Sequence, residues 1–279
     1  MSEISAKPEF EQEAATPKAE GAGDSWRQMA GPIALRALSV VILLLLWEAV
    51  SRVVSADIVP SLWRVVTVFV ASLDDGYVWS DMAITAGRVV VAFALSMSIA
   101  LTIGMALGTV GWFGRMFDFW VTIAAAVPSI LYIVVAYLWM GLNDVAAIAA
   151  SALVVAPSAT FNVIQGVKAI DPGLSEMARA FRVPNRAILL RVLLPQTLPY
   201  LFAAARTGLA LTWKIVIFVE LMGRSSGVGY RIQYFYSLFN MERVLASALP
   251  FMLVMLLIEL VVIRRLEVFL FRWRREEAR

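Results

Sequence analysis

Five ionisable side chains lie within long apolar stretches of this sequence, where they could form ion pairs or contact a charged solute: Glu48, Arg206, Lys214, Glu220 and Glu259. A charge at the centre of a bilayer costs about 2.5 to 3.5 kcal/mol on insertion scales, so each needs a partner or water. Lys214 and Glu220 stand too far round one predicted helix for an i,i+4 pair, so we expect different neighbours for each. Lys214 and Glu220 could line a solute pathway, or they could belong to buried interhelical pairs.

Enzymatic chemistry has little support in the composition. The 279 residues include no Cys and no His, which excludes thiolate nucleophiles, imidazole bases and Cys/His metal sites. The chain also lacks a Gly-x-x-x-x-Gly-Lys-Ser/Thr phosphate loop, so any ATP must be hydrolysed by another polypeptide. We therefore expect a non-catalytic chain with no metal and no cofactor of its own.

The overall composition points to a lipid environment. Hydrophobic residues make up 61% and charged residues 16% of the chain, whereas soluble domains are about half apolar and a quarter charged. The apolar residues fall in runs of about 20, the length that crosses a bilayer as a helix. A net charge of +3 does not indicate nucleic-acid binding, because the basic residues mostly flank these runs. The sequence predicts an all-α integral membrane protein with six spans, at residues 33–53, 83–110, 117–140, 145–164, 198–221 and 244–263.

The loops and tails give an expected topology. Residues 62–73 form a shorter apolar run with a charge at Arg64, which fits an interfacial or re-entrant helix. Lys and Arg are concentrated on the side of the membrane that holds both termini, which predicts cytoplasmic ends and a multi-pass protein of the bacterial inner membrane. We divide the chain into a disordered cytoplasmic tail (1–30), a transmembrane domain (31–265) and a basic cytoplasmic tail (266–279).

The cytoplasmic connection at residues 166–196 has its own helical signals. Asp171 supplies an N-cap acceptor and Pro172 a preset first turn, followed by apolar residues at helical spacing. The sequence 183–185, Val-Pro-Asn, breaks this helix. A second helix leads to Pro195, so we predict two short helices outside the bilayer.

This connection resembles the EAA loop of binding-protein-dependent ABC importers, which reads Glu-Ala-Ala, three residues, Gly, nine residues, Ile, one residue and Leu-Pro. An Arg stands at the position of the glycine, which would otherwise end the helix without a Cβ penalty. By this resemblance, the predicted contacts with the ATPase come from Glu176, Met177, Ala178, Phe181, Arg182, Val192, Leu194 and Pro195.

Further motifs between residues 40 and 265 resemble the permeases of the nitrate, sulfonate and taurine group. These motifs are Trp47-Glu48, Val59-Pro60-Ser61, Gly87-Arg88-Val89, Val127-Pro128, Trp213-Lys214 and the loop at residues 223–230. The resemblance implies the type I ABC importer permease fold and transport of a small anionic solute. It also implies a cytoplasmic ATPase dimer that binds ATP and Mg²⁺, a second permease copy, and a periplasmic or lipid-anchored binding protein, all working in membrane lipid.

Three glycines near the end of the fifth span, Gly223, Gly227 and Gly229, are expected to shape an outer turn and gate a cavity, although a plain flexible loop would look similar. Gly104 and Gly108 in the second span are expected to allow close helix packing. A stand-alone secondary transporter or channel is the alternative function, but its coupling-ion site and inverted repeat are not apparent. An intramembrane enzyme ranks last.

Overall fold

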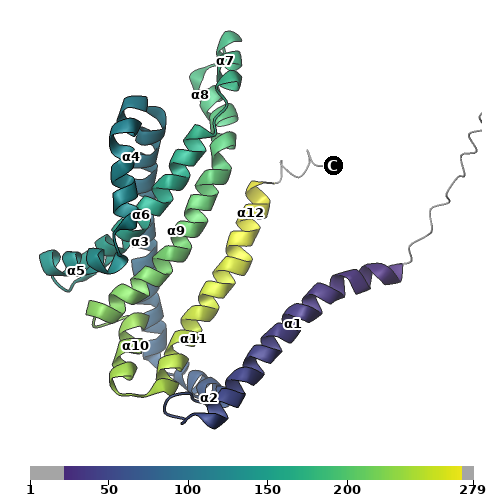
Figure 1. Ribbon diagram of the computed structural model, residues 1–279, viewed down its shortest axis with the longest axis vertical. Coiled ribbons are helices and arrows are strands. Elements are labelled where there is room, and N and C mark those ends of the chain that lie inside the picture. Colours follow the sequence, from purple (N-terminus) through teal and green to yellow (C-terminus); the bar gives the residue numbers. More distant parts are fainter. Residues whose placement is uncertain (1–21, 272–279) are drawn as a thin grey trace, which may run out of the picture. The chain divides into compact units, whose positions relative to one another are not determined.

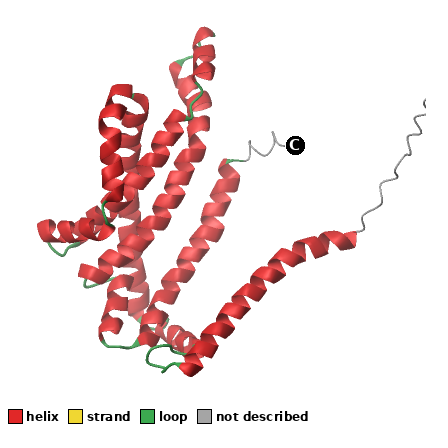
Figure 2. Cartoon of the chain, viewed as in Figure 1, coloured by secondary structure: helices red, strands yellow, loops and turns green. Residues whose placement is uncertain are grey.

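The computed structural model describes residues 22–271, with side chains from residue 34 onward. Every regular element in this range is helical (Figure 2). The chain divides into two compact units, Met1–Val53 and Val54–Arg279. Most of the predicted tails, residues 1–21 and 272–279, lies outside the described residues.

The first unit contributes one long helix, α1 (Ala22–Val53), which begins inside the segment predicted as a tail. Its residues 34–53 are apolar enough to cross a bilayer. Glu48 has Arg52 one turn away, with 3.6 Å between carboxylate and guanidinium. This i,i+4 pair gives Glu48 one of the partners that its position requires.

The second unit is a helical bundle in which three long helices pack together (Figure 1). They are α3 (Gly76–Thr109), α6 (Asp144–Lys168) and α9 (Leu194–Gly223). The central helix is α6, which is rich in Ala and packs against both others. Gly104 and Gly108 lie directly on α6, where an added Cβ would come within 2.7 Å of Val163 and 2.6 Å of Val167. The predicted close packing of these glycines is confirmed.

The remaining elements surround this core. They are α2 (Leu62–Ser72), α4 (Gly111–Ala126), α5 (Ser129–Met140), α7 (Pro172–Ala180), α8 (Asn185–Ile188), a π-helical turn (Leu189–Leu193), α10 (Val228–Ser237), α11 (Met241–Leu257), a second π-helical segment (Ile258–Ile263) and α12 (Arg264–Leu270). The predicted short helix at 62–73 is confirmed as α2, which is capped by Ser61 and packs on α11.

One predicted span is not a straight helix. Instead of a single crossing at 117–140, α4 and α5 meet at an angle of 91°, and α5 projects sideways from the bundle (Figure 1). Val127 adopts an extended conformation because the Pro128 ring disfavours a helical residue before it. Pro128 also has no N–H to continue the helical hydrogen bonds, and the Tyr132 hydroxyl donates across the bend to the Ala124 carbonyl at 2.8 Å.

Five helical stretches are long and apolar enough to cross a membrane, and the bent pair makes a sixth if it counts as one span. On that count the six predicted crossings are all present. The bundle has two distinct ends in Figure 1: α7 and α8 lie at one, and α10 with the turn into α11 lies at the other.

Candidate functional site

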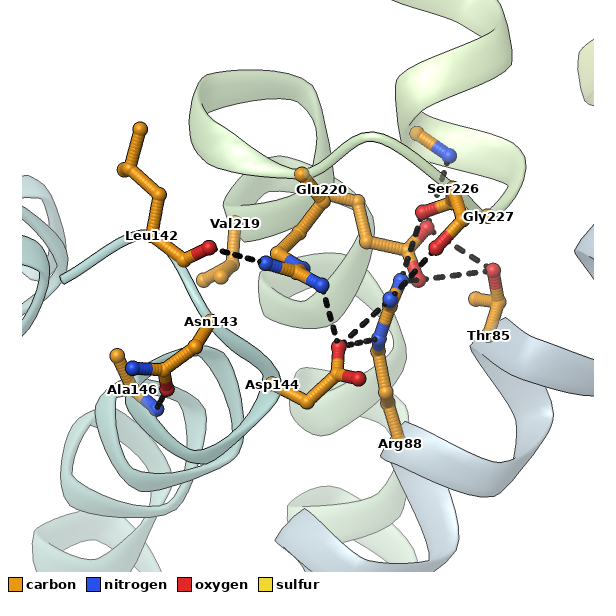
Figure 3. Close-up of polar contacts among 12 residues, drawn as sticks. Thr85, Arg88, Leu142, Asn143, Asp144, Ala146, Val219, Glu220, Ser226 and Gly227 are labelled. Carbon is orange, nitrogen blue, oxygen red and sulfur yellow. Dashed lines mark hydrogen bonds and ion pairs between the residues drawn. The ribbon is translucent and has the colours of Figure 1, made fainter.

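A buried carboxylate, Glu220 on α9, lies at the centre of a polar network (Figure 3). Its side chain is fully buried. Its Oε1 accepts from Arg88 Nη1 at 2.6 Å, and its Oε2 accepts from the Gly229 backbone N–H at 2.9 Å. The Thr85 hydroxyl lies 2.9 Å from both carboxylate oxygens and accepts from the Val228 N–H at 2.9 Å. Glu220 therefore joins α9 to α3 and to the start of α10.

The guanidinium of Arg88 on α3 connects three other elements. Besides Glu220, its Nη1 donates to the Ser226 carbonyl at 2.8 Å and its Nη2 to the Ser226 hydroxyl at 3.0 Å. Its Nε donates to Asp144 Oδ1, at the start of α6, at 2.9 Å. Breaking such a buried pair by removing one partner costs about 3 to 5 kcal/mol, because the other charge stays buried. Arg88 thus holds the α9–α10 turn against α3 and α6.

Further ion pairs extend the network at both sides. Asp144 also pairs with Arg224 at 3.0 Å, and Asp81 pairs with Arg231 at 2.8 Å. Asp81 Oδ1 accepts from the Gly227 N–H at 3.0 Å. The three carboxylates of the network are balanced by the three guanidiniums of Arg88, Arg224 and Arg231, so the cluster is neutral by formal charge.

Two of the predicted glycines are required by this packing. Gly227 has φ +104°, a conformation that residues with a Cβ rarely adopt, and an added Cβ would lie 2.5 Å from the Glu220 carboxyl carbon. At Gly229 the same Cβ would lie 2.7 Å from Glu220 Cβ. Gly223 belongs to a different contact, because its α-carbon packs on Tyr137 of α5. The turn is therefore tightly packed, unlike a plain flexible loop.

The two ionisable residues singled out on α9 have different surroundings. Glu220 lies in the interhelical network, which is the structural alternative given for it. Lys214 is exposed and makes no hydrogen bond or ion pair with any residue that the structure describes. It lines a pocket between α9, α10 and α11. The structure therefore does not bring Lys214 and Glu220 together.

The other two ionisable residues form a pair on the bundle surface. Arg206 on α9 donates to Glu259 at 2.6 and 2.9 Å and to Glu267 at 3.2 Å. These contacts supply the partners that charged groups in apolar helices require.

The predicted coupling loop lies at the end of the bundle opposite the network (Figure 1). The N-cap at Asp171 is confirmed, since its side chain accepts from the Gly173 N–H at 2.8 Å. Gln196 on α9 holds the start of α7, accepting from the Asp171 N–H at 2.8 Å. Glu176 is exposed, and so are the apolar side chains of Leu174, Met177 and Phe181. An apolar face is thus presented outside the long helices.

The remaining predicted loop residues are less accessible or continue into α9. Ala178 is buried, Val192 and Pro195 are half-buried, and Leu194 is exposed at the first position of α9. The second predicted helix is α8, which runs through the π-helical turn into α9 without a break.

Arg182 ends α7 in the conformation that a glycine would favour. Its φ is +58°, in the left-handed region. The Arg182 N–H donates to the Arg179 carbonyl at 2.8 Å and the Val183 N–H to the Ala178 carbonyl at 3.0 Å. These two hydrogen bonds form a Schellman motif with Arg182 at the C′ position. Arg182 therefore ends α7 in a turn geometry that glycine usually provides, at a cost of about 1 kcal/mol for a residue with a Cβ.

Sequence reasoning missed the α3 half of the buried network. Asp81, Thr85 and Arg88 follow one another at spacings of four and three, which places them on one face of a helix. Arg88 also lies inside the predicted 83–110 span but was not counted among the membrane-embedded charges. A polar stripe with an Arg at its end was the available signal.

The network contains no arrangement typical of catalysis. Among residues 22–271, no group of three or more acidic side chains is placed to hold a metal ion. The carboxylates pair with the guanidiniums, although the buried Nε of Arg224 has no acceptor among the described residues. The arrangement therefore joins helices to one another.

Comparisons with known proteins match this chain to a transport family. Residues 98–275 match the model of the family described as "Binding-protein-dependent transport system inner membrane component". The putative aliphatic sulfonates transport permease protein SsuC of Escherichia coli (strain K12) is 30% identical over 186 residues, covering 66% of this chain and 71% of that protein. The putative ABC transporter permease protein MJ0413 of Methanocaldococcus jannaschii is 28% identical over 252 residues, covering 87% and 91%. The taurine transport system permease protein TauC of Escherichia coli is 22% identical, covering 67% and 68%.

These matches and the apolar helices lead to one conclusion. The chain belongs to the family of binding-protein-dependent transport system inner membrane components, and it is a multi-pass, non-catalytic ABC importer permease of the nitrate, sulfonate and taurine group.

Proposed function

We propose that this permease forms the membrane pathway for a small anionic solute and works with a separate cytoplasmic ATPase dimer that binds ATP and Mg²⁺. A second copy of the chain completes the pathway, and a periplasmic or lipid-anchored binding protein delivers the solute. Two of the relatives are named for sulfonate or taurine transport, which supports an anion of this kind. Both termini face the cytoplasm in this proposal, as the Lys and Arg distribution predicts.

The observation that carries the ATPase contact is the exposed apolar face of α7. Phe181 is 76% and Met177 54% exposed, yet α7 is too short to cross a bilayer and lies beyond the long helices. An exposed apolar patch on such an element marks a protein interface. Nucleotide-driven closure of the ATPase dimer would move two such helices together and switch the pathway between outward and inward access.

Co-purification tests this contact directly. The full chain is expressed with its candidate partner ATPase, and the bound ATPase is quantified for the wild type and for Glu176→Lys combined with Ala178→Asp. We expect the double variant to lose both ATPase binding and ATP-dependent uptake. Asp74→Lys is the matched control, because Asp74 is exposed at the opposite end of the bundle and its charge reversal should leave ATPase binding intact. Wild-type levels of binding and uptake in the double variant would refute the docking assignment.

A further inference from the structure

A pocket of about 590 Å³ lies between α9, α10 and α11, and Val228 is the one residue of the Glu220 network that lines it. Its walls are almost entirely apolar and include Trp213, Ile217, Ile232, Phe251 and Met255. Pockets of 300 to 1,000 Å³ with apolar walls and a few polar groups are typical of sites for small organic molecules. The shape and lining of this pocket therefore fit a ligand with an apolar body.

One cation that lines the pocket has no partner. Three charged residues line it, and Arg206 pairs with Glu259 through contacts of 2.6 and 2.9 Å and with Glu267, which lies outside the lining, at 3.2 Å. The third, Lys214, has no hydrogen bond or ion pair with any described residue. Lys214 lies nine residues before the end of α9 at Gly223, which is about 14 Å along the helix axis. An ammonium at this depth needs an anion or water.

The neighbouring Trp213 adds a second incomplete interaction. Its ring lines the pocket and packs edge-on against Phe251, with 4.9 Å between ring centroids. The side chain is buried, and its indole Nε1 has no acceptor among the described residues. Indole N–H groups usually find a partner when buried. The indole N–H of Trp213 and the ammonium of Lys214 therefore both lack an acceptor among the described residues.

We propose that this pocket binds an organic anion, a sulfonate or carboxylate with an alkyl or aryl body. Lys214 contacts the anionic head, and the body lies along the wall formed by Trp213 and Phe251. This inference rests on the proposed transport function and narrows its substrate class. A bare inorganic anion would satisfy Lys214 but leave the apolar walls without a partner, so it should bind more weakly.

Binding measurements with a series of alkanesulfonates test the assignment. The full chain is purified with its ATPase in nanodiscs of zwitterionic lipid and titrated calorimetrically with ethane-, butane-, hexane- and octanesulfonate and with nitrate. We expect affinity to rise about fourfold per added methylene at most, with nitrate weakest. Lys214→Met should weaken hexanesulfonate binding at least tenfold, whereas Lys214→Arg should retain it. Arg115→Met is the control, because Arg115 is an exposed cation on α4, which does not line the pocket.

Several results would overturn the assignment. Affinity that depends on chain length but not on Lys214 would show a groove for lipid or detergent chains. Nitrate bound as tightly as hexanesulfonate would show a plain anion site. Competition by anionic phospholipid, measured in matched nanodiscs, would assign the anion to a lipid headgroup. If Lys214→Met, but not the other variants, failed to associate with the ATPase, Lys214 would have a structural role instead of a ligand-binding one.

The same preparations separate this inference from the proposed function. If the wild type binds its ATPase and supports ATP-dependent uptake but no sulfonate binds the pocket, the subsite is wrong and the transport function stands. If the wild type fails to associate with the ATPase, the proposed function itself fails.

Discussion

Exchange of Glu220 for Gln removes one charge from the buried network with almost no change in side-chain volume. Glu220 accepts on both oxygens, from Arg88 at 2.6 Å and from the Gly229 N–H at 2.9 Å. Whichever position the new amide NH₂ takes, it meets one of these donors, so a hydrogen bond is replaced by a repulsive contact. Breaking a buried pair costs about 3 to 5 kcal/mol. In this variant Arg88 still donates to Asp144 and to the Ser226 carbonyl. We therefore expect the free energy of unfolding to fall by an amount at the lower end of this range, about 3 kcal/mol.

Thermal unfolding of the purified variant in detergent measures this loss. At roughly 2 to 4 °C per kcal/mol for a chain of this size, the Tm of Glu220→Gln should fall by about 6 to 12 °C. Glu242→Gln is the control, because Glu242 pairs with Arg64 at 3.0 Å on a largely exposed surface, where such pairs contribute about 1 kcal/mol or less. If Glu220→Gln lowered the Tm no more than Glu242→Gln, the network would not hold the α9–α10 turn as described.

Three further predictions concern positions where the backbone or packing is tight. Gly227→Ala should lower the Tm and uptake together, because φ +104° and the contact with Glu220 cost about 2 to 4 kcal/mol in strain and overpacking; wild-type unfolding would contradict this packing. Gly104→Ala should destabilise the protein by about 1 to 3 kcal/mol, because the added methyl group would clash with Val163. Gly87→Ala is the control and should be neutral or slightly stabilising, because its methyl group would meet nothing within 4 Å. Equal Tm values for the two variants would refute the α3–α6 contact. Arg182→Gly should stabilise the α7 turn by about 1 kcal/mol, seen as slower hydrogen exchange at the Val183 amide, and faster exchange there would contradict the left-handed geometry.

Local signals in the sequence predicted much of the fold. The apolar runs and caps specified the long helices, α2 and the α7–α8 break, because helix periodicity, N-caps and proline act over a few residues. The same locality explains why the sharp bend in the third span was not predicted. Val127-Pro128 was visible in the sequence, but a proline in an apolar run is compatible with either a kinked crossing or a sharp bend.

The candidate site was only half predictable. Glu220 and the glycines after it were singled out by their position, but their partners lie far away in the chain: Arg88 and Glu220 are separated by 132 residues. Long-range pairing of this kind depends on how α3, α6 and α9 pack, which no local pattern encodes. The absence of a described partner for Lys214 could be learned only from the structure.

The most direct test of the central claim is solute uptake into vesicles that contain this chain together with its ATPase and binding protein. The measurement compares taurine, alkanesulfonates, nitrate and aromatic acids, with and without ATP, and omits each component in turn. The account predicts accumulation of an organic anion that requires ATP and all three components. Uptake by this chain alone, without ATP, would contradict the account and favour a stand-alone secondary transporter or channel.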